Sequence, residues 1–442
     1  MSRNKVPLLK MPDGTNYLFP FIMITSLFLL WGFAHGLLDV LNKHFQEILH
    51  LSKGESGFIQ FSLYIAYFVM AVPAGLFIKK YGYKKGILLG LFLFACGAFL
   101  FYPATKFGAY LPFLIALFVL ACGLACLETA ANPYSTVLGP SEQSARRINI
   151  SQSFNGLGWI LGPLLGGLLI FGAEEATEET KFDSVATPYM YVGIVVVIVL
   201  IIFSFIKLPT IKEKSNTEIQ EDPPMKNLLK HPFFVFAVIA QFLYVAAQTG
   251  INSFFINYVI DAIPDVQTPI AGMMNNMGWF GTVFMPKNPE QAASLILAIG
   301  GMGMFFIGRL LGAYFMKFIS PARLLLIFAI VNTILMALVL AHLGWVSVVA
   351  LFMNYFFMSI MFPTIFALGV SGLGPLTEKG SSFLVMAVAG GAFCPPLMGW
   401  FADMTSMAIS FIIPLVCFFV IAVFAAKGTK RKVLVSEMPV GH

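Results

Sequence analysis

Residues 21–41 read FIMITSLFLLWGFAHGLLDVL, an apolar run long enough to cross a bilayer, and it contains one carboxylate, Asp39. A second such run, residues 118–139, reads FVLACGLACLETAANPYSTVLG and carries Glu128 near its middle. These two carboxylates are the ones that sit deep inside long apolar runs. A charged side chain at bilayer depth is costly, so it usually faces a polar cavity and functions there. Asp39 and Glu128 are therefore either functional groups in such a cavity or satisfied structural acids.

The rest of the chain has the composition of a membrane protein. Of its 442 residues, 58% are hydrophobic and only 11% are charged, which is outside the range of soluble globular domains. The apolar runs are continuous rather than alternating, unlike the strands of an outer-membrane barrel. They cover residues 18–42, 56–78, 86–103, 109–139, 149–172, 189–207, 233–261, 291–318, 324–342, 346–372, 380–402 and 407–426. The sequence predicts an all-α integral membrane protein with twelve transmembrane helices.

The basic residues predict how the chain is oriented. Cytoplasmic loops of membrane proteins are enriched in Lys and Arg. With a cytoplasmic N-terminus, most of the 27 Lys and Arg residues fall on the cytoplasmic side, and those outside are Lys43, Lys53, Lys106, Lys181 and Lys287. We therefore predict a multi-pass protein of the cytoplasmic (inner) membrane with both termini in the cytoplasm. The net charge of +6 follows from this asymmetry and indicates no nucleic-acid partner.

Two pairs of segments repeat at nearly the same offset. They are GLFIKK from Gly75 with GAYFMK from Gly312, and LGPSE from Leu138 with LGPLTE from Leu373. Such a duplication favours two pseudo-symmetric six-helix halves around a central substrate site. We predict an N-terminal half over 1–207, a cytoplasmic linker over 208–232, and a C-terminal half over 233–442 that ends in a cytoplasmic tail. The outer loop over 262–290 is too long for a turn, and a short amphipathic helix against the outer mouth is one possibility.

Polar side chains recur at helical spacing within several predicted helices. Amides both donate and accept hydrogen bonds, so amides on facing helices suit a polyhydroxylated ligand. Each amide taken alone could equally join two helices, a common arrangement in membrane bundles. The predicted substrate-binding residues are Glu128, Asn132, Gln152, Asn155, Gln248, Asn252, Tyr244 and His35. The predicted proton-coupling residues are Asp39 and Glu128.

Coupled transport requires a group whose charge changes during the cycle. A carboxylate that is neutral on one side of the membrane and ionised on the other meets this requirement. Sodium coupling would favour several converging oxygen ligands, and no such cluster stands out. Arg309 lies near the cytoplasmic end of the eighth predicted helix. The sequence favours a structural role, in which it extends toward the cytoplasmic interface or binds helix-end carbonyls, over a functional one.

Other classes of chemistry have little support in this sequence. All five cysteines fall within predicted helices, where we expect them to serve in packing. There is no metal-ligand spacing and no nucleophile signature. We therefore predict that the protein is not an enzyme and that it uses no metal and no cofactor.

Several segments of the sequence are also similar to those of a known family. They are WGFAHGLLDVL from Trp31, CLETAANP from Cys126 with VLGP from Val137, RINISQSFN from Arg147, AAQT from Ala246, MFPTIFALG from Met361 and GSSFLVM from Gly380. Together they resemble the fucose, galactose and hexose proton symporters of the major facilitator superfamily, and CLETAANP is the most specific. The resemblance implies the major facilitator fold. It also implies that Asp39 and Glu128 take part in proton coupling and that Gln152 and Asn155 line the sugar cavity.

The chain departs from this pattern around Asp39. It has His35, Gly36 and Leu38 where the fucose permeases of this family have Asn residues. His35 could hydrogen-bond Asp39, share its proton, or be a satisfied structural group. The prediction is a proton-coupled importer of a monosaccharide, L-fucose or a related hexose, that works by alternating access in the lipid bilayer, as a monomer. A sodium-coupled or uncoupled sugar facilitator on the same fold is the alternative.

Overall fold

The computed structural model describes residues 7–11, 14–140, 144–171, 183–206, 208–209, 225–316, 318–373 and 376–430. Within these residues, twelve helical spans are long and apolar enough to cross a membrane. They are Leu18–Ile48, Lys53–Ile78, Tyr83–Phe107, Tyr110–Ser135, Ile150–Ile170, Ala186–Phe205, Pro232–Ala262, Pro289–Phe315, Pro321–Leu340, Trp345–Val370, Phe383–Met404 and Met407–Lys430. Each predicted apolar run overlaps one span. The prediction of an all-α protein with twelve transmembrane helices is confirmed.

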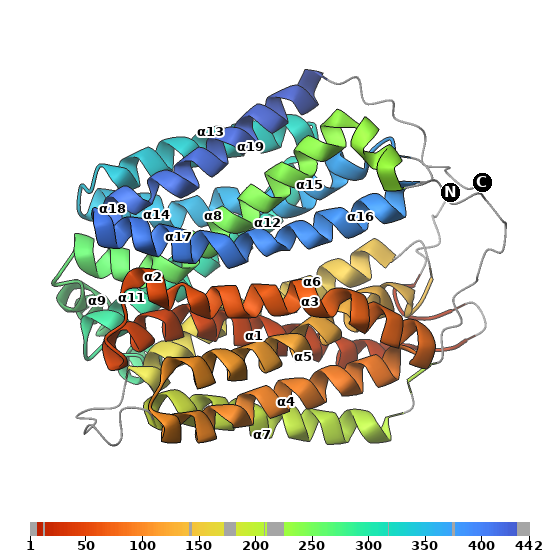
Figure 1. Ribbon diagram of the computed structural model, residues 1–442, viewed down its shortest axis with the longest axis horizontal. Helices are drawn as coiled ribbons and strands as arrows, with labels where there is room; N and C mark the ends of the chain where they lie inside the picture. The colour runs from red at the N-terminus through yellow and green to blue at the C-terminus, as the bar shows by residue number, and fades with distance from the viewer. Residues whose placement is uncertain are drawn as a thin grey trace.

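The helices form two bundles that lie side by side, as Figure 1 shows. The first bundle contains α1 (Leu18–Ile48), α2 (Lys53–Ser56), α3 (Phe58–Tyr81), α4 (Tyr83–Phe107), α5 (Tyr110–Val137), α6 (Ser144–Ile170) and α7 (Asp183–Phe205). In this bundle α1 packs on α6, while α5 packs on both α3 and α4. The predicted linker 208–232 lies largely outside the described residues. Its described end forms the short helix η2 (Met225–Lys230).

The second bundle contains several interrupted helices. Its elements are α8 (Pro232–Ala262), α9 (Gln267–Met274), α10 (Gly278–Val283), α11 (Pro289–Leu295), η3 (Ile296–Met302), α12 (Gly303–Phe315), α13 (Pro321–Leu340), α14 (Trp345–Met358), α15 (Met361–Val370), α16 (Thr377–Met386), η5 (Ala387–Ala389), α17 (Gly390–Met404), α18 (Met407–Ser410) and α19 (Ile412–Lys430). The element η3 is a π-helical turn, α14 and α15 are separated by a break, and η5 is a 3₁₀ turn between α16 and α17. Irregular helical backbone at membrane depth is tolerated where it is buried in protein or lines a cavity. These interruptions are therefore expected on the inner side of the bundle.

Small residues bring α1 and α6 into backbone contact. A side chain added at Gly32 would meet the backbone of Asn155, and one added at Gly158 would meet the backbone of Leu29. Close approach of helix backbones at small residues is a common way to join membrane helices. This contact fixes the residues of α6 relative to those of α1.

The two bundles are joined at the end where α1 and α8 finish. We call it the α2 end, because α2 lies there. The Asp403 carboxylate on α17 accepts hydrogen bonds from the backbone N–H groups of Lys53 (3.1 Å) and Gly54 (2.8 Å) on α2. The Asn288 amide donates to the backbone carbonyl of Phe171 at 2.9 Å. The hydrogen bonds between the bundles in the described part of the chain therefore close the α2 end.

The long loop over 262–290 also lies at the α2 end, where it forms two short helices, α9 and α10 (Figure 1). The sequence suggested one short helix in this loop, and the structure has two. Met273 and Trp279 of this segment are strongly exposed, at 61% and 77%. Exposed Trp side chains are typical of the membrane–water interface.

Candidate functional site

Glu128 lies in a cluster of polar groups from three helices of the first bundle. Its carboxylate on α5 interacts with the amide of Asn132, one turn further along, and lies near the hydroxyl of Tyr67 on α3. The Gln152 amide on α6 donates a hydrogen bond to Oδ1 of Asn132 at 3.3 Å. Glu128, Asn132 and Gln152 are each partly accessible. Three of the predicted substrate-binding residues are therefore brought together and can contact a ligand.

His35 adjoins this cluster through Tyr67. Its ring stacks on Trp159 with centroids 5.4 Å apart and meets the Tyr67 ring edge at 5.8 Å. Nδ1 lies 3.0 Å from the backbone carbonyl of Trp31. Because a carbonyl can only accept, Nδ1 carries the hydrogen, and Nε2 of the neutral ring is an acceptor. His35 turns back along α1 and forms no hydrogen bond with Asp39 in the described structure.

Asp39 forms no hydrogen bond with the Glu128 cluster in the described structure and is almost fully buried, with 2% of its surface exposed. Its Oδ1 accepts a hydrogen bond from Nε2 of Gln60 on α3 at 3.3 Å, and its Oδ2 has no partner among the described residues. No described Lys, Arg or His forms an ion pair with it. An ionised carboxylate buried without a counter-charge is strongly unfavourable. The surroundings of Asp39 therefore suit a neutral carboxylic acid.

The part of α1 that follows Asp39 contacts α8 of the other bundle. The Asn42 amide donates to the backbone carbonyl of Ser253. Next to Ser253, Oδ1 of Asn252 accepts a hydrogen bond from the Tyr355 hydroxyl at 2.7 Å, and Asn252 is only 2% exposed. Asn252, a predicted substrate-binding residue, is therefore held by Tyr355 beside the α1–α8 contact in this conformation.

The other predicted residues differ in how free their polar groups are. Gln248 on α8 is partly accessible and makes no hydrogen bond to a described residue. The Tyr244 hydroxyl donates to the backbone carbonyl of Met358 at 3.2 Å. The Asn155 amide nitrogen donates to the backbone carbonyl of Phe28 at 3.2 Å, which adds to the α1–α6 contact. Gln248 therefore offers a free amide, whereas Tyr244 and the Asn155 nitrogen already have protein partners.

Helix α3 supplies a polar face that was missing from the predicted site. Gln60 contacts Asp39, Tyr67 lies beside Glu128, and Tyr64 lies close to Thr249 of α8 and within electrostatic range of both acids. The three side chains are spaced four and three residues apart, which places them on one face of a helix. This spacing was visible in the sequence and would have identified them.

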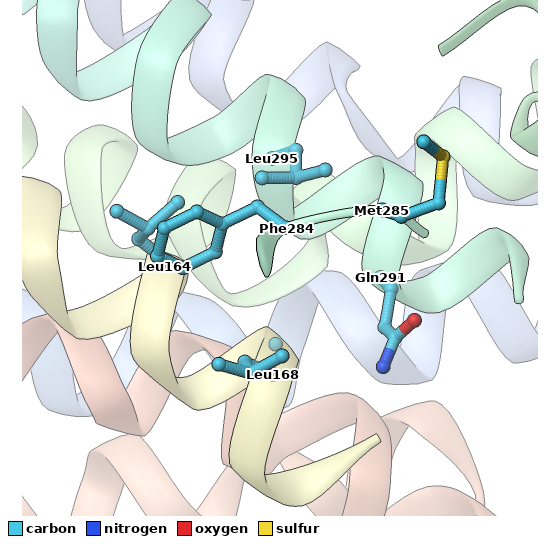
Figure 2. Close-up of a pocket in the computed structure, with 7 residues that line it drawn as sticks. Leu164, Leu168, Phe284, Met285, Gln291 and Leu295 are labelled. Atoms are coloured by element: carbon cyan, nitrogen blue, oxygen red, sulfur yellow. The ribbon is translucent and has the colours of Figure 1, made fainter. Parts of the chain in front are cut away.

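A separate pocket lies at the α2 end, between α6 and the segment around α11 (Figure 2). It is lined by Leu164, Gly167, Leu168, Phe284, Met285, Gln291 and Leu295. Its one polar side chain, Gln291, already accepts a hydrogen bond at Oε1 from the backbone N–H of Lys287, at 2.6 Å. A sugar site needs several converging polar groups. This apolar pocket therefore does not fit a sugar.

Comparison with known proteins supports a transporter. The chain is 35% identical to the L-fucose-proton symporter of Escherichia coli over 93% of its own length and 94% of that protein. It is 34% identical to a glucose/galactose transporter of Brucella abortus, over 94% of this chain and 95% of that protein. These relatives are transporters, and the protein is not an enzyme.

Solved structures show the same fold. The crystal structure of the transporter FucP in the outward conformation matches with a TM-score of 0.67 at 34% identity, covering 93% of this chain and 99% of that one. A D-xylose-proton symporter matches in fold alone, with a TM-score of 0.68 at 15% identity, covering 93% of this chain and 98% of that one. The sequence model of the Major Facilitator Superfamily matches residues 21–388. The chain belongs to the Major Facilitator Superfamily.

Proposed function

We propose that this protein is a proton-coupled importer of a monosaccharide, L-fucose or a related hexose, across the inner membrane. The observation that carries the proposal is the pair of intramembrane acids in contrasting surroundings. Glu128 is partly accessible among amides, whereas Asp39 is buried without a counter-charge among the described residues. Relatives at 33–35% identity are named as L-fucose-proton symporters and glucose/galactose transporters, which supports this substrate class.

The sugar binds between the two bundles. Glu128, Asn132 and Gln152 contact its hydroxyl groups from the first bundle, with His35 Nε2 as a further acceptor. Gln248 contacts it from the second bundle. Amides and a carboxylate that converge from different helices match the alternating donors and acceptors of a sugar. Asn155, Tyr244 and Asn252 support the residues of this site. Each contacts the sugar only after the bundles move relative to one another.

The two acids have different parts in proton coupling. Glu128 exchanges its proton where it meets the sugar, so binding and protonation depend on each other. Asp39 couples protonation to the movement between the bundles, because the same helix contacts α8 through Asn42 and Ser253. In the closed arrangement, in which hydrogen bonds join the bundles at the α2 end, Asp39 is buried and neutral. Separation of the bundles exposes Asp39 and lets it ionise. A charge change at a bundle interface can bias such a two-state movement.

The excess of basic residues orients the chain with both termini in the cytoplasm. In this orientation the α2 end faces outward, so the hydrogen bonds that Asp403 accepts from the backbone of Lys53 and Gly54 close the outer side. Alternating access then requires these bonds to break when the site opens outward. Because each chain contains both bundles and one complete site, it functions as a monomer.

The test is uptake by purified protein in liposomes with labelled L-fucose, D-galactose and D-glucose. We expect accumulation of at least one sugar under an inward proton gradient, and its loss on addition of a protonophore. Accumulation that persists with the protonophore and disappears without sodium would replace proton by sodium coupling. Equilibration without accumulation under any ion gradient would indicate an uncoupled facilitator.

A further inference from the structure

Arg309 on α12 does not lie as the sequence led us to expect. Its guanidinium sits over the ring of Phe305, with Cζ 4.8 Å from the ring centroid. Phe305 is one turn back along α12, so the side chain is directed away from the end of the helix and into the membrane-spanning region. The structure therefore supports neither an extension to the cytoplasmic interface nor bonds to helix-end carbonyls.

The guanidinium has no acceptor among the residues that the structure describes. Its Nε is buried without a hydrogen-bond partner, and no described carboxylate forms an ion pair with Arg309. A guanidinium carries five N–H donors and stays charged. An ionisable group that is unpaired at membrane depth marks a functional site by default.

The surroundings place Arg309 on the face of α12 that is turned toward the first bundle. The ring of Phe306 approaches Gly156 of α6, the residue that follows Asn155. Arg309 is three residues after Phe306 and shares this face of the helix. It also lies within electrostatic range of the Tyr244 hydroxyl on α8.

Two tyrosines indicate that Arg309 and the acids of the first bundle lie near the same region. Tyr244 is within electrostatic range of Tyr64 on α3, and Tyr64 is within electrostatic range of Glu128. Arg309 and Glu128 therefore lie near the same central region on opposite bundles. Arg309 supplies only hydrogen-bond donors, and the Glu128 carboxylate accepts hydrogen bonds.

We propose that Arg309 contacts the substrate directly and donates two parallel N–H bonds to a pair of neighbouring sugar oxygens. The inference rests on the proposed sugar transport. It identifies the Arg309 guanidinium as the group that recognises one edge of the sugar ring. The planar fork of a guanidinium fits two adjacent oxygens, whereas the ammonium of a lysine is a point charge and does not. With Glu128 as acceptor on the other side, the two bundles hold the sugar in one orientation.

The test is equilibrium binding to the purified full-length protein in detergent, measured by calorimetry with the sugar that the wild type binds and with its monodeoxy analogues. The variants are Arg309→Lys and Arg309→Met. Arg323→Met, at an exposed arginine outside the site, is the control. We expect both Arg309 variants to bind the parent sugar about 10- to 100-fold more weakly, the range for hydrogen bonds to a charged group.

The deoxy analogues separate a contact from a structural role. For the wild type, removal of a hydroxyl read by Arg309 weakens binding. In the Arg309 variants the loss of affinity caused by removing this one hydroxyl disappears, while the losses caused by removing the other hydroxyls remain. Unchanged affinity in both variants, or an equal loss for every analogue, would overturn the proposal.

Two further measurements keep the test decisive. If neither Arg309 variant folds, Phe305→Leu removes the ring that supports the guanidinium, and it should reduce the same hydroxyl penalty; an unaltered penalty would count against the proposal. Tighter wild-type binding of a hexuronate than of the neutral sugar would overturn the assignment to a neutral oxygen pair. Failure of the wild type to bind any sugar would instead reject the proposed function.

Discussion

Gln60 on α3 donates a hydrogen bond to the Asp39 carboxylate on α1, with Nε2 and Oδ1 3.3 Å apart. The same helix carries Tyr67 beside Glu128. One rigid element therefore touches both intramembrane acids, although the acids belong to different helices. Movement of α3 that accompanies a protonation change at Asp39 would also change the surroundings of Glu128.

Replacing Gln60 with Met removes this link while keeping a similar side-chain volume. Loss of one hydrogen bond changes an equilibrium by about 0.5–1.5 kcal/mol. We expect proton-driven sugar accumulation in liposomes to fall about 2- to 10-fold, with a smaller effect on sugar exchange. Gln267→Met, in the loop at the α2 end, is the matched control. Normal accumulation by Gln60→Met would show that the link has no part in coupling.

Glu128→Gln keeps the hydrogen-bonding shape of the side chain and removes its ability to release a proton. We expect uphill accumulation driven by a pH gradient to disappear, while sugar binding or exchange is partly retained. Counterflow with labelled sugar at equal pH on both sides measures the retained exchange. Undiminished uphill uptake would remove Glu128 from the coupling mechanism.

Asp39→Asn makes this position permanently neutral, as in the closed arrangement. We expect sugar exchange without net proton movement. A pH-sensitive dye in the external medium measures the alkalinisation that accompanies sugar uptake. Wild-type alkalinisation in the variant would contradict the part assigned to Asp39.

Gly158→Ala tests the contact between α1 and α6. The added methyl group would collide with the backbone of Leu29. Overpacking of this kind costs about 1–3 kcal/mol, so we expect a lower midpoint of thermal unfolding in detergent. Gly75→Ala is the control, because a side chain there would have open space around it. Equal midpoints for the two variants would show that α1 and α6 adapt without cost.

Asp403→Ala tests the closure of the α2 end. It removes both hydrogen bonds to the backbone of α2, so the separated arrangement of the bundles should become more populated. Spin labels at Lys106 and Met404, exposed on opposite bundles, measure the separation. We expect the fraction at long distance to rise several-fold relative to Asp403→Glu, which retains a carboxylate. An unchanged distance distribution would show that Asp403 does not hold the bundles together.

Several features of this protein were predictable because they depend on residues near one another in the chain. The twelve spans follow from apolar run length, since every backbone polar group in a bilayer must be paired within a helix. The clustering of Glu128 and Asn132 follows from their i, i+4 spacing. The polar face of α3 has the same kind of signal, because Gln60, Tyr64 and Tyr67 are spaced four and three residues apart.

Contacts between helices were decided by the tertiary structure. His35 and Asp39 share a helix face, yet His35 bonds the Trp31 carbonyl and Asp39 bonds Gln60. Likewise Asn252 pairs with Tyr355, more than a hundred residues away in the chain. A side chain with several rotamers can reach more than one partner, and the packing of neighbouring helices selects among them.

The sequence by itself determined the membrane class, the number of spans and the two acids on which the proposed mechanism rests. These depend on the free energy of placing each residue in a bilayer, which is a local quantity. Only the tertiary structure decided that Asp39 is buried with no counter-charge among the described residues, that Glu128 is partly accessible, and that Arg309 is directed into the membrane-spanning region. Burial and pairing depend on which helices surround a residue, and this surrounding is created by the packing of the whole bundle.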